Sequence, residues 1–130
     1  GDLESSLKQE CIALGISEKV SFLGVRTDVS ELMMAMDIFL MPSLFEGMPV
    51  VVIEAQATGL PCVISDKVPA PNLTGRVKVV QLADENKKWT NVLLSYDDFQ
   101  RVKATDMIIK GNYDIVHEAR KLHDFYIQNI

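Results

Sequence analysis

Two carboxylates, a glycine and a proline lie close together near the middle of the chain. Glu46 and Gly47 fall in residues 41–49, which are typical of a strand end followed by a loop, and Glu54 follows in the first turns of a helix predicted to open at Pro49. Glycine permits close approach of a ligand to the backbone, and the amides at a helix N-terminus can bind a phosphate. The two carboxylates can accept hydrogen bonds from sugar hydroxyls. The segment therefore indicates a nucleotide-sugar site.

The elements that must position these residues alternate between strands and helices. The apolar spacing predicts strands over residues 20–23, 38–41, 62–64 and 77–82, and helices over residues 3–14, 49–58, 86–95 and 115–126. A further helix, capped by Asp28 or Ser30, is predicted to run to residue 36, and another begins at cap residues 96–98 and runs to residue 110. Gly15 and Gly59 are placed to end helices. The pattern favours βαβ units in an α/β fold, a Rossmann-like parallel sheet with flanking helices.

Length and composition restrict the classes of function. The chain has 130 residues, enough for one domain, and its net charge of −5, from 13 basic and 18 acidic residues, argues against nucleic acid as the main partner. No apolar run approaches the ~20 residues that cross a bilayer, and no signal segment is present. These features predict a cytoplasmic protein. The absence of a Gly-x-Gly-x-x-Gly pattern disfavours a nicotinamide-dependent oxidoreductase.

Several other reactive residue types are better explained by structural roles. Cys11 and Cys62 fit no metal or redox spacing, and Cys62 is expected to pack as a small hydrophobe. His117 and His123 are six residues apart, so they do not share a helix face at a metal-binding spacing. We expect the Asp97–Asp98 pair to cap a helix rather than to bind a metal. The remaining group is expected to fill the core, and comprises Met33, Met34, Met36 and Met41.

Three stretches together resemble family 4 of the retaining glycosyltransferases, and most closely the enzymes of bacterial capsular and exopolysaccharide synthesis. They are residues 22–33 (FLGVRTDVSELM), residues 37–49 (DIFLMPSLFEGMP) and residues 54–66 (EAQATGLPCVISD). The Glu46 to Glu54 spacing within a strand–loop–helix context is the most specific part of the resemblance. It implies the C-terminal, donor-binding domain of an enzyme with the GT-B fold, in which two Rossmann-like domains enclose a cleft.

The resemblance also implies roles for individual residues. Glu46 would lie beside the transferred sugar as the catalytic carboxylate, and Glu54 would accept hydrogen bonds from the ribose hydroxyls. The donor's sugar and phosphates would bind at the turn formed by Gly47, Met48, Pro49 and Val50. Gly24 and Arg26 would lie against the nucleotide base. Two alternatives stay open at this point: a surface pair of Arg26 with Asp28 or Glu31, and a turn or cap role for Asp66 in place of ligand contact.

The implied donor is a nucleotide diphosphate sugar, expected to be UDP-linked, and no metal or other cofactor is expected. A saccharide or lipid-linked acceptor would be bound by an N-terminal domain that residues 1–130 do not include. The chain opens on a helix where a doubly wound domain opens on a strand. We therefore expect a partial domain that is inactive alone, whose full-length form is cytoplasmic or peripheral at the inner face of the membrane.

Two other functions remain open from the sequence alone. A sugar-nucleotide epimerase with the GT-B fold would share the architecture, although the Glu46 to Glu54 spacing favours a transferase. A binding or assembly module with a vestigial site would share the residues but not the chemistry. An incomplete sheet would also leave an uncovered edge, and such an edge can pair with a second chain to form a dimer.

Overall fold

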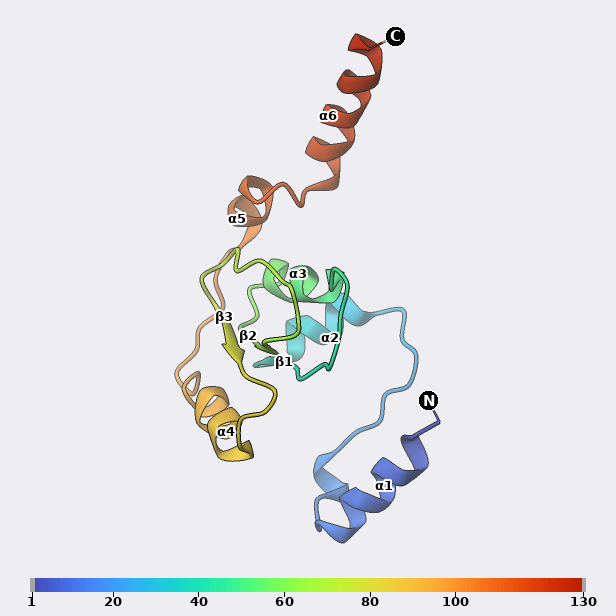
Figure 1. The fold of residues 1–130 in the computed structure, drawn as a ribbon, viewed down its shortest axis with the longest axis vertical. Coiled ribbons are helices and arrows are strands. Elements are labelled where there is room, and N and C mark those ends of the chain that lie inside the picture. Colours follow the sequence, from blue (N-terminus) through green and yellow to red (C-terminus); the bar gives the residue numbers. More distant parts are fainter. Residues whose placement is uncertain (1, 130) are drawn as a thin grey trace.

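A parallel sheet of three strands lies at the centre of the chain, as a computed structural model of residues 2–129 shows (Figure 1). The strands β1 (Phe39–Met41), β2 (Cys62–Ser65) and β3 (Val77–Val80) pair in the order β1-β2-β3. The described residues also form a short 3-10 helix η1 (Ser17–Lys19) and the helices α1 (Glu4–Ala13), α2 (Val29–Ala35), α3 (Val50–Ala57), α4 (Asn86–Leu94), α5 (Thr105–Lys110) and α6 (Ile115–Gln128). The predicted α/β class with parallel strands is confirmed.

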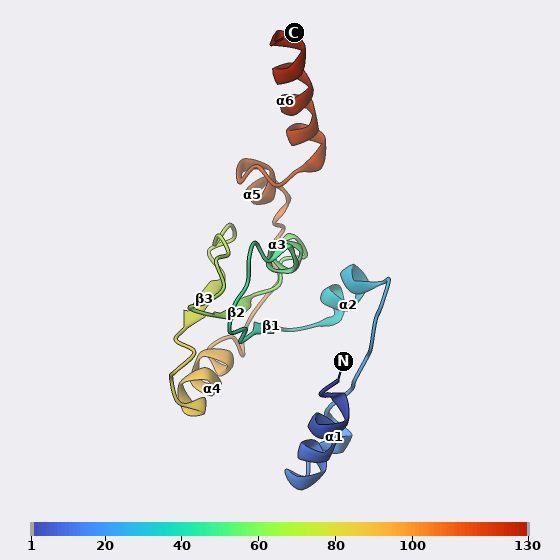
Figure 2. The same ribbon diagram turned by 45° about the vertical axis from the view of Figure 1, so that its right-hand side comes forward.

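The core lies around β2, which has a neighbouring strand on each side. Phe39 pairs with Cys62 and Cys62 with Val77, so that the three strands are in register across the sheet. All four residues of β2 are buried, as expected for a strand covered on both faces. Helices α3 and α4 lie on opposite sides of the sheet (Figure 2). Cys62 is fully buried as predicted, and both cysteines are free thiols.

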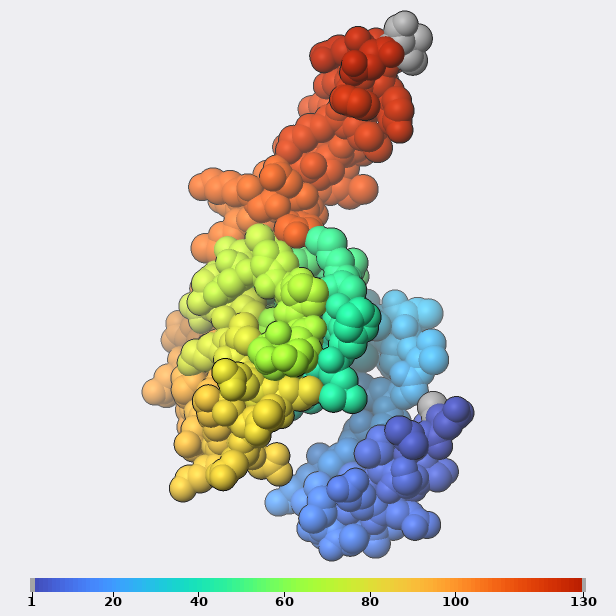
Figure 3. All heavy atoms as spheres, viewed as in Figure 1, coloured from blue at the N-terminus to red at the C-terminus, as the bar shows by residue number. Residues whose placement is uncertain are grey.

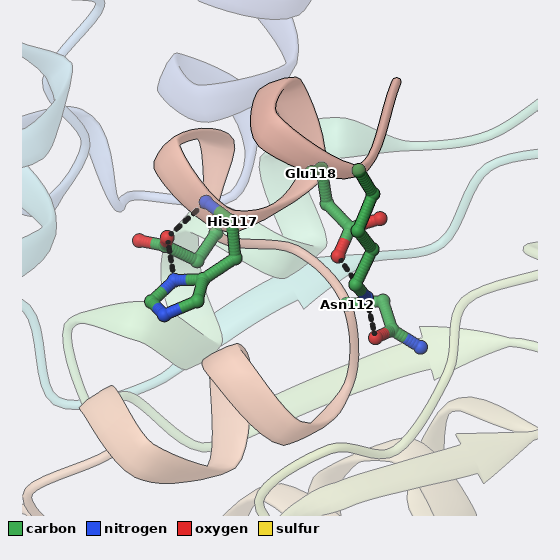
Figure 4. A network of polar contacts seen from close by, with 5 residues as sticks. Asn112, His117 and Glu118 are labelled. Atoms are coloured by element: carbon green, nitrogen blue, oxygen red, sulfur yellow. Dashed lines mark hydrogen bonds and ion pairs between the residues drawn. The ribbon is translucent and has the colours of Figure 1, made fainter. Parts of the chain in front are cut away.

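The two ends of the chain extend away from this core. Helices α1 and α6 contribute no buried residue, and both project from the central mass (Figure 3). The start of α6 is held by polar contacts (Figure 4): Asp114 accepts a hydrogen bond from the His117 amide at 2.9 Å, and Lys121 bridges Asn112 and Glu118. No helix within residues 2–129 is both long and apolar enough to cross a bilayer.

Glycines end two helices where the sequence predicted. After α3, Gly59 has a φ of +74°, its amide donates to Gln56 O at 2.9 Å, and the next amide, that of Leu60, donates to Ala55 O at 3.0 Å. This pair of hydrogen bonds is the Schellman arrangement, which requires the left-handed conformation that glycine adopts most readily. Gly15 ends α1 in the same way, with a φ of +67°. These turns determine where α1 and α3 end.

The prediction of a strand over residues 20–23 is wrong. This stretch is extended but pairs with no strand in the described part of the chain. Phe22 and Leu23 remain 38% and 50% exposed, and Val25 is fully exposed. An extended apolar segment becomes a strand only when a neighbour accepts its backbone hydrogen bonds. The sheet therefore has three strands in residues 2–129, rather than the expected four.

The predicted start of the next helix, at residues 96–98, is also wrong. These residues form a turn after α4, and α5 begins at Thr105 with Ala104 at its N-cap. Asp97 and Asp98 therefore cap no helix. The chain turns here because Tyr96 and Phe99 pack edge to face, with ring centroids 6.4 Å apart, and the Arg76 guanidinium lies 4.9 Å from the Phe99 centroid.

Smaller differences concern methionines and helix starts. Met33 is buried, as predicted, but Met34 is 58% exposed and Met36 lies at the surface, because α2 presents only one side to the core. Asp28 occupies the N-cap position of α2, yet its side chain makes no capping hydrogen bond. Pro49 is the N-cap of α3 rather than its first residue, since its ψ of 87° is not helical.

Candidate functional site

The loop of residues 42–49 carries Glu46 and leaves the sheet at the C-terminal end of β1. Its first part is tied to the neighbouring strand, because the buried Ser65 hydroxyl at the end of β2 donates to the Ser43 carbonyl at 2.6 Å. The C-terminal ends of parallel strands are where open α/β sheets bind ligands. Glu46 is half-buried within this loop, whereas Gly47 and Met48 are exposed. The loop therefore presents a partly sheltered carboxylate at the edge expected to bind ligand.

Gly47 differs from the helix-ending glycines in having no structural requirement for glycine. Its φ lies outside the left-handed region, and a Cβ placed on it would meet no atom within 4 Å. Neither backbone conformation nor packing within the described residues excludes a side chain there. What glycine does provide is an unobstructed backbone next to Glu46, which allows a ligand to approach closely.

Helix α3 begins directly after this loop. Pro49 is buried, whereas Val50, the first helical residue, is 59% exposed. The N-cap residue makes no side-chain hydrogen bond to the amides of the first turn. These amides lie at the positive end of the helix dipole. The geometry is that of a helix start at the ligand edge of a sheet.

Glu54 lies one turn further along α3 and is exposed at a cavity between two helices. The cavity has a volume of about 240 Å³ and is lined by Glu54 together with four residues at or near α2: Thr27, Val29, Ser30 and Met33. Most of the surrounding α3 residues face the core, with Val52, Ile53 and Ala55 buried. One acidic residue, two hydroxyl-bearing residues and two apolar residues therefore line a single small cavity.

Gly24 and Arg26 precede α2, on the other side of this cavity. Gly24 has a φ of +64°, so the chain turns there in a conformation that favours glycine. The Arg26 guanidinium forms a two-pronged ion pair with Asp28, in which Nε donates to Oδ1 at 2.7 Å and an amino nitrogen bonds the other oxygen. Hydrogen bonding to Arg26 lowers the pKa of Asp28, and the same contact raises the pKa of Arg26. The alternative of a surface pair with Asp28 thus describes Arg26 in this structure.

The structure brings some of the predicted residues together and keeps others apart. A second hollow of about 330 Å³ is lined by residues 25–28 and shares Thr27 with the Glu54 cavity. Arg26 and Glu54 therefore border adjoining spaces. Glu46 does not line the Glu54 cavity. Two separate carboxylate positions result, one on the loop after β1 and the other on α3.

Asp66 has a structural role. One carboxylate oxygen accepts the Leu82 amide at 2.8 Å and the other pairs with Lys67 at 2.7 Å, and these contacts lower the pKa of Asp66. Asp66 thus holds the chain after β3 to the end of β2, as the turn alternative expected.

Two polar residues that organise the site were not singled out from the sequence. The side chain of Gln56 is fully buried, donates to Pro71 O at 2.9 Å and accepts the Leu73 amide at 2.8 Å, thereby fixing residues 71–74 to α3. Arg101 donates to carbonyls at the C-terminal ends of α2 and α3. A glutamine within an apolar helix is a usable signal for the first role, whereas a single arginine in a loop gives none.

The family of this chain follows from comparison with known proteins. Residues 1–96, which include both carboxylates and both cavities, match the family described as glycosyl transferases group 1. The chain belongs to this family. The match supports the transferase interpretation and not the epimerase alternative.

Individual relatives of this group 1 chain are bacterial glycosyltransferases. It is 30% identical over 145 residues to the UDP-Gal:alpha-D-GlcNAc-diphosphoundecaprenol alpha-1,3-galactosyltransferase of Escherichia coli. This alignment covers 100% of the chain and 35% of the Escherichia coli protein. The chain is 29% identical over 132 residues to the lipopolysaccharide core biosynthesis mannosyltransferase LpsB of Rhizobium meliloti (strain 1021), covering 95% of the chain and 38% of LpsB. The chain thus spans little more than a third of the length of these relatives.

A solved structure supports the fold independently. The crystal structure of WaaG, a glycosyltransferase involved in lipopolysaccharide biosynthesis, superposes with a TM-score of 0.63 at 22% sequence identity. The superposition covers 81% of this chain and 35% of the WaaG chain. The sheet and its flanking helices therefore have the fold of part of a GT-B glycosyltransferase.

Proposed function

We propose that this chain is the donor-binding part of a retaining glycosyltransferase that transfers a hexose from a nucleotide diphosphate sugar. The observation that carries the proposal is a cavity of about 240 Å³ within a group 1 domain, which Glu54 lines together with Thr27 and Ser30. A carboxylate is a strong acceptor for the paired hydroxyls of a ribose. The adjoining hollow beside Arg26 would take the base.

The loop after β1 would bind the reacting end of the donor. The diphosphate lies near the first backbone amides of α3, which begins at Val50, because the helix dipole favours negative charge there. Gly47 and Met48 leave the backbone open for the sugar. The Glu46 carboxylate lies beside the sugar and stabilises the positive charge that develops in an oxocarbenium-like transition state. Transfer is proposed to need no metal or other cofactor, so that turnover by the full-length enzyme should be undiminished in excess EDTA.

UDP is the proposed nucleotide, supported by the named donor of the Escherichia coli relative. The acceptor is a saccharide or a lipid-linked saccharide, held by polypeptide outside residues 1–130 in an acceptor domain. A lipid-linked acceptor would place the full-length protein in the cytoplasm, peripheral at the inner face of the membrane. Residues 1–130 alone are expected to show negligible transferase activity, and measurable turnover of a donor sugar would contradict this.

Isothermal titration of the 130-residue chain with UDP tests the donor site. The wild-type chain is expected to bind UDP, and Glu54→Gln is expected to weaken binding about tenfold or more, because hydrogen bonds to a charged acceptor contribute roughly 1.5–3 kcal/mol. Glu10→Gln is the matched control, since Glu10 lies exposed on α1, outside the cavity. Absence of UDP binding by both forms would instead support a vestigial site, whereas equal binding by Glu54→Gln and the wild-type chain would contradict the role of Glu54.

We also propose that the open edge of the sheet can pair with a second copy of the chain. Within residues 2–129, strand β1 has a neighbour only on its β2 side, and Leu40 at its centre is 45% exposed. Unpaired strand edges readily add another strand. Size-exclusion chromatography with light scattering should show a dimer that Leu40→Pro disrupts, because proline removes a backbone donor from the edge. A monomer at all concentrations would contradict pairing.

A further inference from the structure

Arg101 joins two helices that are distant from it in sequence. Its guanidinium donates to Thr58 O, at the C-terminal end of α3, and to Met33 O, near the C-terminal end of α2, each at 2.8 Å. It also donates to Met36 O, the C-cap residue of α2. Carbonyls in the last turn of a helix lack the full set of helical hydrogen bonds, although Met33 O also accepts the Met36 amide at 3.4 Å, and a cation there interacts favourably with the helix dipole. One planar side chain thus satisfies the ends of two helices.

The segment that carries Arg101 is itself closely fitted against α3. A Cβ on Gly59 would lie 2.3 Å from Val102 O, so the backbone of residue 102 passes directly over the last turn of α3. Three residues beyond Arg101, Ala104 is 2% exposed. Arg101 therefore starts from a fixed backbone, and its contacts with the two helices are set by the way residues 99–104 pack.

The contact between α2 and α3 also determines the cavity that holds Glu54. Met33 is the buried residue of α2 and lines this cavity, and its carbonyl is one of those bound by Arg101. Thr27, Val29 and Ser30 approach Glu54 from the start of α2. Helix α2 has seven residues and so is only about 10 Å long, which means that a displacement at its C-terminal end is carried to its N-terminal end.

We propose that Arg101 is a positioning residue for the donor site: by holding the C-terminal ends of α2 and α3 together, it sets the width of the cavity between Thr27, Ser30 and Glu54. Arg101 binds at the C-terminal ends of the two helices and does not itself line the cavity. The inference rests on the proposed function for the nature of the ligand, but not for the coupling between Arg101 and the cavity.

The test compares three variants of the 130-residue chain in UDP titrations and in backbone amide NMR spectra without ligand. Arg101→Met removes the donors, whereas Arg101→Lys keeps the charge and is the conservative rescue. Val80→Ala is the stability control, because Val80 is buried in β3 and outside the cavity. We expect Arg101→Met to raise the Kd for UDP about tenfold, Arg101→Lys to recover part of that loss, and Val80→Ala to leave the Kd within about twofold while it lowers the melting temperature.

The ligand-free spectra separate this inference from the proposed function. Arg101→Met, or Arg101→Lys if the first variant does not fold, should shift the amide resonances of Thr27, Ser30 and Glu54, and Val80→Ala should not. If these resonances stay in place, Arg101 does not position the cavity, whether or not UDP binds. If they shift but the wild-type chain binds no UDP, the proposed ligand is wrong and the coupling stands. Equal weakening of UDP binding by Val80→Ala would reduce Arg101 to a general stabilising role and overturn the proposal.

Discussion

Replacing Gly59 by alanine should destabilise the chain strongly, for reasons that can be worked out from the end of α3. An L-residue at a φ of +74° costs about 1–2 kcal/mol. The new Cβ would lie 2.3 Å from Val102 O, and ordinary contact begins at 3.4 Å, so residue 102 must retreat by about 1 Å. That movement strains the neighbouring hydrogen bond from Arg101 to Thr58 O, which contributes about 1 kcal/mol. We expect a total loss of roughly 3 kcal/mol.

Urea unfolding followed by circular dichroism measures this loss, and thermal unfolding should show a decrease of roughly 10 °C for a chain of this size. Gly47→Ala is the matched control, because its φ is not left-handed and a Cβ there meets no atom within 4 Å. The control should change stability by less than about 0.5 kcal/mol. A Gly59→Ala chain as stable as the control would refute the close packing of residue 102 on α3.

Three further predictions test the core and its charges. Gln56→Leu should cost about 2 kcal/mol, since the buried polar groups of residues 71–74 lose their partner, and the Leu73 amide should exchange faster with solvent; unchanged exchange would contradict the role of Gln56. Burial raises the pKa of the Cys62 thiol to about 12, so iodoacetamide at pH 8 should label Cys11 in the folded chain but Cys62 only after unfolding. Mass spectrometry of the peptides would measure the labelling, and equal labelling rates in the folded chain would disprove the burial. Arg26 holds the pKa of Asp28 below its usual 3.8, so the pair stabilises the chain above about pH 4, and this contribution is lost as pH falls through the lowered pKa. The difference in melting temperature between wild type and Asp28→Asn should therefore shrink on acidification. A constant difference would exclude the linkage.

The features that could be predicted from the sequence are those encoded locally. Gly15 and Gly59 ended helices because the left-handed turn needs glycine whatever lies around it. The strands β1 and β2 follow from uninterrupted apolar runs, although only β2 is buried along its whole length and Leu40 at the centre of β1 is exposed, contrary to the expectation of a strand covered on both faces. The loop with Glu46 and the helix with Glu54 fell where expected because strand, loop and helix signals follow one another without ambiguity.

The features that were predicted wrongly or missed depend on contacts between distant residues. Residues 20–23 have the composition of a strand, but pairing needs a neighbour, and no property of the segment itself reveals whether one exists. The role of Arg101 depends on carbonyls 43 to 68 residues away, which no local pattern encodes. The roles of Glu46 and Glu54 in donor binding remain predictions, and the UDP titration addresses that of Glu54.

The absence of buried residues from α1 and α6 has a consequence for how the chain unfolds. The fully buried positions fall between Met33 and Ala104, so that cooperative stability is concentrated in that stretch. Segments with few buried contacts open locally at low free-energy cost, independently of global unfolding. Hydrogen exchange should therefore protect β2 and α3 long after the amides of α1 and α6 have exchanged. A protease that cuts at the exposed residues 20–25 would remove α1 and leave a folded centre with Glu46, Glu54 and Arg101 in place.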